Sequence, residues 1–105
     1  MDVSNTNPTP PPSYQSDFNQ SVELFEKSFK NMTSSQNPEQ KLIYQDVMKK
    51  SLQVMQDSAH AMFNKHLVEL KNNLSSDLNS YLTAPSSENQ EKVLDDIQQI
   101  KRNED

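Results

Sequence analysis

The sequence predicts an elongated all-α protein of three helices, in which two helical hairpins share one long central helix after a disordered N-terminal arm. Three observations lead to this prediction. The 46 residues between Pro38 and Pro85 contain neither glycine nor proline, and their apolar residues recur at helical spacing. The whole chain of 105 residues lacks glycine, and only 31% of it is hydrophobic. Helices laid side by side around a thin core fit this composition better than layered sheets.

Residues 1–15 are predicted to form the disordered arm. Four of the six prolines lie at positions 8, 10, 11 and 12, among serine, threonine and asparagine. Such a segment favours the extended polyproline II conformation and cannot bury enough apolar surface to fold. The helical domain is therefore expected to cover residues 16–105.

A first helix is predicted over residues 16–33, with Ser16 or Asp17 as its N-cap. Its apolar residues are spaced by four, three, four and three positions, which is typical of one face of a helix. They are Phe18, Val22, Phe25, Phe29 and Met32. We interpret this stripe as the face that packs against the central helix.

The central helix is predicted over residues 38–82, because Asn37 is a favourable N-cap and Pro38 suits the first helical position. Its apolar stripe runs from Tyr44 to Tyr81 with a mean step of 3.7 residues, closer to an eleven-residue repeat than to the heptad of a long left-handed coiled coil. Short polar residues at positions 72, 73, 75 and 76 favour turns, so a hinge is expected there if the helix breaks.

A third helix is predicted over residues 87–102, capped by Ser86 or Ser87 and ending in Lys101 and Arg102, which favour a helix C-terminus. Pro85 separates it from the central helix. Short connections favour antiparallel neighbours, so the first and third helices should fold back over the two halves of the central helix.

Together the flanking helices could cover most of the length of the central helix, but only from one or two sides, so an apolar strip should remain exposed. Further apolar residues widen this face in the first half, as if that half contacts two neighbours. They are Ile43, Val47, Val54, Ala61, Phe63 and Leu67. We expect the stripe to bind a protein partner or to self-associate, since flexible thioethers suit adaptable surfaces. Ordinary core packing is the competing interpretation of these side chains. The candidate partner-binding residues are Met48, Met55, Met62, Leu70, Leu74 and Leu78.

Composition argues against several functions. The net charge is −5 and no stretch forms a basic patch, so no nucleic-acid partner is expected. The longest apolar run is three residues, and the start of the chain lacks the layout of a signal peptide, which predicts no membrane span and a cytoplasmic or non-classically secreted protein. Without glycine, a P-loop or Rossmann nucleotide site is excluded.

No catalytic residue, metal site, cofactor or small-molecule substrate is predicted. His60 and His66 differ in direction by about 120° on one helix and cannot share a metal ion there. His66 is expected to be partly buried and His60 exposed. Asp95 and Asp96 are expected to be solvated, with no second carboxyl group beside them. The sequence therefore predicts a protein that is not an enzyme.

The sharpest short motif is formed by Pro11, Pro12, Ser13 and Tyr14, which match the Pro-Pro-x-Tyr peptide bound by WW domains. Prolines preset the extended conformation that docks between aromatic rings, and the tyrosine fills a second groove. An adaptor that recruits WW proteins is thus one alternative function. A neutral linker is the competing interpretation.

The segment from Leu74 to Lys101 resembles the helix, Pro/Ser/Asn turn and helix of the needle subunits of bacterial type III secretion systems. The arm is similar to their Ser/Thr/Asn-rich secretion signals. Needle subunits continue into a long C-terminal helix that polymerises, whereas this sequence ends about 18 residues after the turn. The resemblance implies a second alternative: a secreted component, effector or chaperone of such an apparatus.

Overall fold

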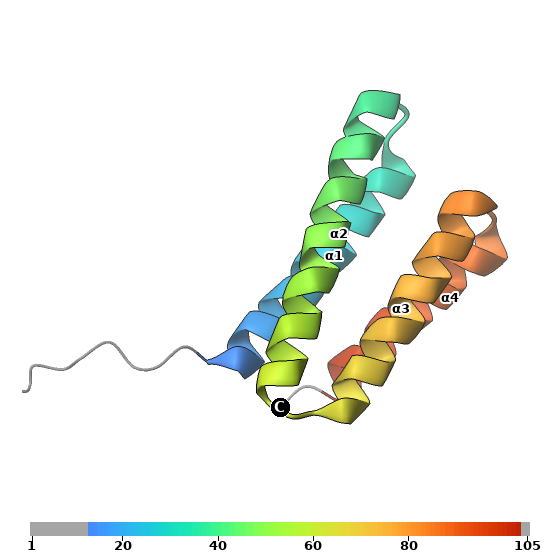
Figure 1. The fold of residues 1–105 in the computed structure, drawn as a ribbon. Coiled ribbons are helices and arrows are strands. Elements are labelled where there is room, and N and C mark those ends of the chain that lie inside the picture. Colours follow the sequence, from blue (N-terminus) through green and yellow to red (C-terminus); the bar gives the residue numbers. More distant parts are fainter. Residues whose placement is uncertain (1–12, 104–105) are drawn as a thin grey trace, which may run out of the picture.

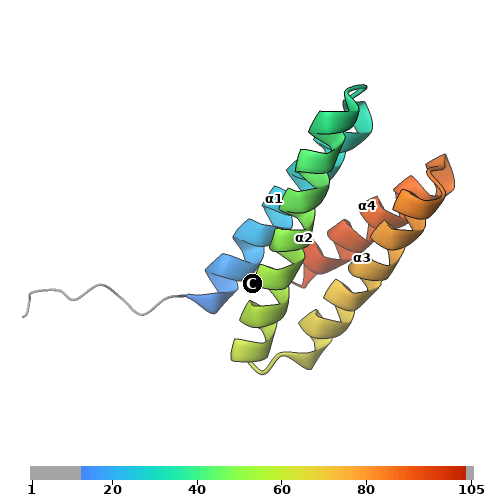
Figure 2. The same cartoon turned by 45° about the horizontal axis from the view of Figure 1, so that its top comes forward.

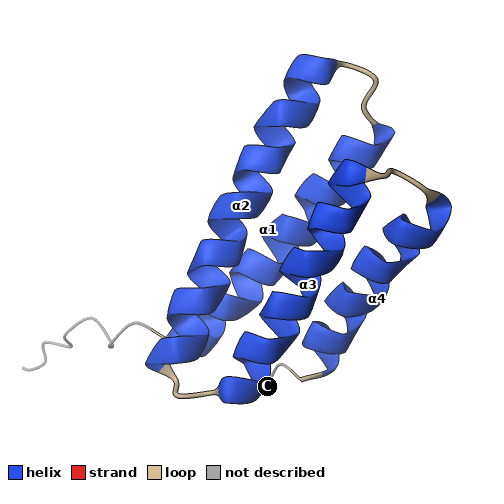
Figure 3. Ribbon diagram, turned by 45° about the vertical axis from the view of Figure 1, so that its right-hand side comes forward, coloured by secondary structure: helices blue, strands red, loops and turns tan. Residues whose placement is uncertain are grey.

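The computed structural model describes residues 13–103, which form four helices and no strand. The helices are α1 (Tyr14–Ser34), α2 (Pro38–Ala61), α3 (Lys65–Thr83) and α4 (Ser87–Arg102). Figure 1 shows that they run alternately up and down, as two antiparallel hairpins joined end to end. Figures 2 and 3 show the α3–α4 hairpin lying alongside the α1–α2 hairpin. The predicted all-α class is confirmed.

The predicted single helix over residues 38–82 is wrong, because the chain turns back at residues 62–64. Phe63 has a left-handed backbone with φ of 54°. Its N–H donates to the carbonyl of His60, and the N–H of Asn64 donates to the carbonyl of Ala59, each at 3.0 Å. These two bonds form a Schellman motif, which ends helices and usually places glycine at the left-handed position. Asn64 then starts α3 by accepting the N–H of Leu67 on its side chain.

Apolar periodicity concealed this break. Ala59 and Leu67 are buried on either side of the break and lie eight residues apart. On a continuous helix, two side chains with this spacing would point in directions only about 80° apart. The stripe therefore passes through the turn with little change of phase. The hinge predicted at residues 72–76 is also wrong, since α3 is helical throughout this stretch and its buried residues Leu74 and Leu78 hold it in place.

Capping explains where the other helices begin. Asn37 accepts the N–H groups of Glu39 and Gln40, and Pro38 is the first residue of α2, as predicted. Ser86 caps α4, one of the two predicted alternatives. Helix α1 instead begins at Tyr14 with Ser13 as its cap, so its first two residues lie within the range expected for the arm. The rest of that predicted arm, residues 1–12, lies outside the described residues.

The core is one apolar cluster to which all four helices contribute. Phe29 of α1 is fully buried, and its ring stacks on Phe25 at 6.5 Å and meets Tyr81 of α3 edge to face at 5.3 Å. Because α1 and α3 are not consecutive, this contact ties the two hairpins together through the centre of the bundle.

Four serines are buried on α1 and α2, the two helices that make the most extensive contact. Ser21 and Ser28 are seven residues apart on α1, and Ser51 and Ser58 are seven apart on α2, so each pair lies on one face of its helix. The hydroxyls of Ser21 and Ser51 donate to carbonyls of their own helices and are thereby satisfied. These small side chains allow close approach, and α1 and α2 form the most extensive helix pair of the bundle.

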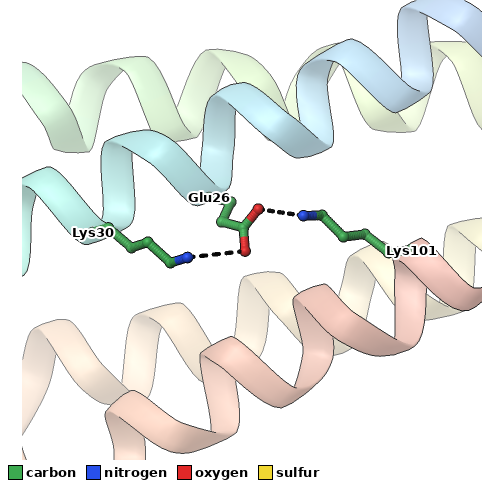
Figure 4. A network of polar contacts seen from close by, with 3 residues as sticks. All are labelled: Glu26, Lys30 and Lys101. Atoms are coloured by element: carbon green, nitrogen blue, oxygen red, sulfur yellow. Dashed lines mark hydrogen bonds and ion pairs between the residues drawn. The ribbon is translucent and has the colours of Figure 1, made fainter.

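An ion pair joins α1 and α4. Figure 4 shows Glu26 of α1 between Lys30 of its own helix, at 3.4 Å, and Lys101 of α4, which donates to its carboxylate. The Glu26 side chain is only 14% exposed. This burial alone would raise its pKa, but the hydrogen bond and charge of Lys101, together with Lys30, outweigh it and lower the pKa of Glu26 below its ordinary 4.5.

We expect Glu26→Gln to lower the free energy of unfolding by about 1 kcal/mol at pH 7, since a charged partner of Lys101 is lost. A lowered folded-state pKa contributes stability above the unfolded pKa and loses it as pH falls through the folded value. The difference between the two proteins should therefore shrink below about pH 4.5. Urea unfolding at pH 7 and pH 3 measures this, with the exposed Glu23→Gln of the same helix as control. An undiminished difference at pH 3 would contradict it.

Candidate interaction surface

The exposed large apolar side chains of the described residues all lie between residues 14 and 63. They are Tyr14, Leu24, Leu42, Ile43, Val54 and Phe63. Helices α3 and α4 bury or half-bury every large apolar side chain that they carry. Exposed apolar surface is thus concentrated on the first hairpin and on the turn that follows it.

One part of this surface is the outer face of the first hairpin, which we define by Leu24, Ile43 and Val54. Ile43 and Val54 are eleven residues apart, so they lie within about 20° of each other around α2. Val54 and Leu24 line one shallow hollow of about 200 Å³ between α1 and α2. The broad apolar face predicted for the first half of the central helix is therefore divided. Met48 and Met55 lie in the core, whereas Ile43 and Val54 lie on this surface.

The second part is the elbow, which we define as the α2–α3 turn and the hollow beside it. Phe63 is 92% exposed there, at the end of the bundle where α2 meets α3. The adjoining hollow measures about 360 Å³ and has Ala59, Phe63 and Val68 as its apolar wall. Its polar rim comprises His60, Asn64, Lys65 and Glu69.

Replacing Phe63 with glycine is expected to stabilise the protein by about 1 kcal/mol. A side chain with a Cβ atom is strained in the left-handed region, and glycine is not. The exposed ring contributes little packing that could be lost. Thermal unfolding should show a higher Tm for Phe63→Gly, whereas Phe63→Ala, which keeps the Cβ atom, should show no comparable rise. An equal rise in both variants would contradict backbone strain as the cause.

The residues of the apolar stripe that were predicted to bind a partner are buried or partly buried. Met48, Met55, Leu74 and Leu78 are buried in the core of the monomer, and Met62 and Leu70 pack partly against it. Those side chains are occupied within the chain, as the competing interpretation of ordinary core packing holds. The exposed apolar side chains are instead other residues of α1, α2 and the elbow.

The Pro-Pro-x-Tyr motif is divided by the boundary of the described residues. Pro11 and Pro12 lie outside them, while Tyr14 is half-exposed and is the first residue of α1. WW domains bind this motif in an extended conformation. Binding would therefore require the first turn of α1 to unwind.

Both histidines are exposed, so the expected partial burial of His66 is wrong. The neighbouring Leu67 is the residue that α3 buries at this position. Among residues 13–103, no group of three or more His, Cys, Asp or Glu side chains could hold a metal ion. The helices of this same range include none long and apolar enough to cross a membrane.

Asp96 departs from the solvated position expected for it, because α4 places it against Asp77 of α3. Its Oδ2 atom is shielded from solvent and has no hydrogen-bond partner. Burial raises the pKa of Asp96, and the hydrogen bond and charge of Asp77 and the charge of Asp95 raise it further, to about 7. The sequence could not show this pair, because the two residues belong to different helices.

Asp96→Asn is expected to stabilise the protein at pH 8 by about 1 kcal/mol, after allowance for solvent screening. A raised folded-state pKa contributes stability below the unfolded value of 3.8 and loses it as pH rises through about 7. The wild type should therefore lose stability between pH 5 and pH 8, and the asparagine variant should lose less. Thermal melts across this range test the difference, with Glu91→Gln, at an exposed position of the same helix, as control. Parallel curves for wild type and Asp96→Asn would contradict the proposed pair.

Comparison with known proteins yields no relative from which a function could be transferred. No family model matches the chain, and neither the curated proteins nor the solved structures contain a significant match.

Proposed function

We propose that this protein is a non-enzymatic interaction module that binds protein partners through the apolar side chains exposed on its first hairpin and elbow. One observation carries the proposal: the exposed large apolar residues of the described chain are confined to residues 14–63. Chance exposure would distribute such residues over both hairpins. Apolar groups gathered on one part of a small protein are typical of a surface that another molecule covers.

The distribution of polar residues supports the same function. The outward faces of α3 and α4 carry mainly Lys, Glu, Asp, Asn, Gln and Ser, which gives this hairpin an ordinary solvated surface. The carboxyl pair of Asp77 and Asp96 is the feature closest to an acid–base site. Because Oδ2 of Asp96 is shielded from solvent, we assign the pair to helix packing and not to chemistry on a substrate.

Site-specific photo-crosslinking in the source cells tests this function. A photoreactive phenylalanine analogue replaces Ile43 on the outer face or Phe63 at the elbow, and Glu91 on the exposed side of α4 serves as the matched control. We expect discrete protein adducts from positions 43 and 63 and none from position 91. Equal adducts from all three positions, or none from any, would overturn the proposal.

A further inference from the structure

The elbow combines a protruding ring with a hollow of suitable size. Phe63 is the most exposed large apolar residue of the described chain, and it stands on a left-handed backbone that glycine would occupy with less strain. Strain retained at an exposed position is a reason to look for a function of the side chain. The Phe63 ring contributes little to the core and is accessible to another molecule.

The hollow beside Phe63 has an apolar wall that includes Ala59 and Val68 and a volume of about 360 Å³. This volume is near the lower end of the range for ligand pockets, and it is ample for one aromatic side chain. The same short segment therefore presents both an aromatic ring and a place to receive one.

The charges at the rim suit a second copy of the chain. Lys65 and Glu69 lie one helical turn apart on α3, are both exposed and have opposite signs. In a two-fold dimer one patch meets itself in the opposite direction, so each patch must contain its own complement. A two-fold axis that passes between these two residues would place Lys65 of one copy near Glu69 of the other copy, and the reverse.

We propose that the elbow is a self-complementary docking surface for a second copy of this chain, each copy placing its Phe63 ring in the apolar hollow of the other. This inference rests on the proposed function and names a partner for it. The elbow alone covers less area than the 1,200 Å² or so typical of stable complexes. The dimer should therefore be weak, with a Kd on the order of 100 µM.

Analytical ultracentrifugation of the full chain between about 10 and 500 µM tests the dimer. The weight-average mass of the wild type should rise from 12.1 kDa towards twice that value. Phe63→Gly should raise Kd at least tenfold, and thermal unfolding of the same sample checks that the variant is folded. Glu91→Ala, at an exposed position of α4 outside the proposed binding surface, is the control and should leave Kd unchanged.

A charge exchange tests the orientation of the two copies. Lys65→Glu alone should weaken the dimer several-fold, because it places like charges opposite each other. Combining it with Glu69→Lys should restore most of the affinity. A double variant as weak as the single one would overturn the two-fold arrangement.

Two further outcomes separate this inference from the function on which it rests. A wild type that stays monomeric at 500 µM, or a Phe63→Gly variant that dimerises like the wild type, overturns the elbow dimer. Photo-crosslinked adducts with other proteins from positions 43 or 63 would still support the interaction module. Adducts at twice the mass of the chain, obtained from position 63 alone, would support the dimer.

Discussion

Replacing Phe29 with alanine is expected to lower the free energy of unfolding by about 3–5 kcal/mol. The ring is fully buried and contacts Phe25 on its own helix and Tyr81 on α3, so its removal leaves a cavity between the two hairpins. Small domains are stable by only about 5–15 kcal/mol. The variant should therefore unfold at a much lower urea concentration, which circular dichroism at 222 nm measures.

Leu24→Ala on the same helix is the matched control for this experiment. Leu24 is 48% exposed and leaves the core cluster intact. Its replacement should change stability by less than about 1 kcal/mol. Similar losses in both variants would contradict the central position of Phe29 in the bundle.

Replacing Ser51 with leucine is expected to destabilise the protein by about 1–3 kcal/mol or more, although leucine is the more hydrophobic residue and the better helix former. Ser51 is 2% exposed on α2, which makes its most extensive helix contact with α1. A larger side chain must push the helices apart or leave its preferred rotamer. Urea unfolding measures the change.

Ser51→Ala separates the effect of size from that of the hydroxyl group. The hydroxyl donates to the carbonyl of Val47 in its own helix. Its removal therefore breaks no hydrogen bond between helices. Alanine also favours the helical conformation. Its stability should lie within about 0.5 kcal/mol of the wild type or above it, and a leucine variant as stable as the alanine variant would contradict the tight contact.

Local signals predicted much of the secondary structure. Asn37, Pro38 and Ser86 identified two helix starts, and the spacing from Phe18 to Met32 identified the buried face of α1. These signals involve residues within a cap or a few helical turns of one another, so they can be recognised from the sequence. The Phe63 turn has no such signal except Asn64, a good N-cap, because glycine is absent from its usual position.

The sequence by itself determined that the chain is helical, where most helices begin, and that its apolar residues are too few for a thick core. Only the tertiary structure decided that the central segment folds back at Phe63, that Met48 and Met55 lie inside while Ile43 and Val54 lie outside, and that Asp96 meets Asp77. The physical reason is the range of the forces involved. Strain at Phe63 costs about 1 kcal/mol locally, whereas bringing two hairpins together buries several side chains worth about 1.5–3 kcal/mol each, and that gain depends on residues far apart in the chain.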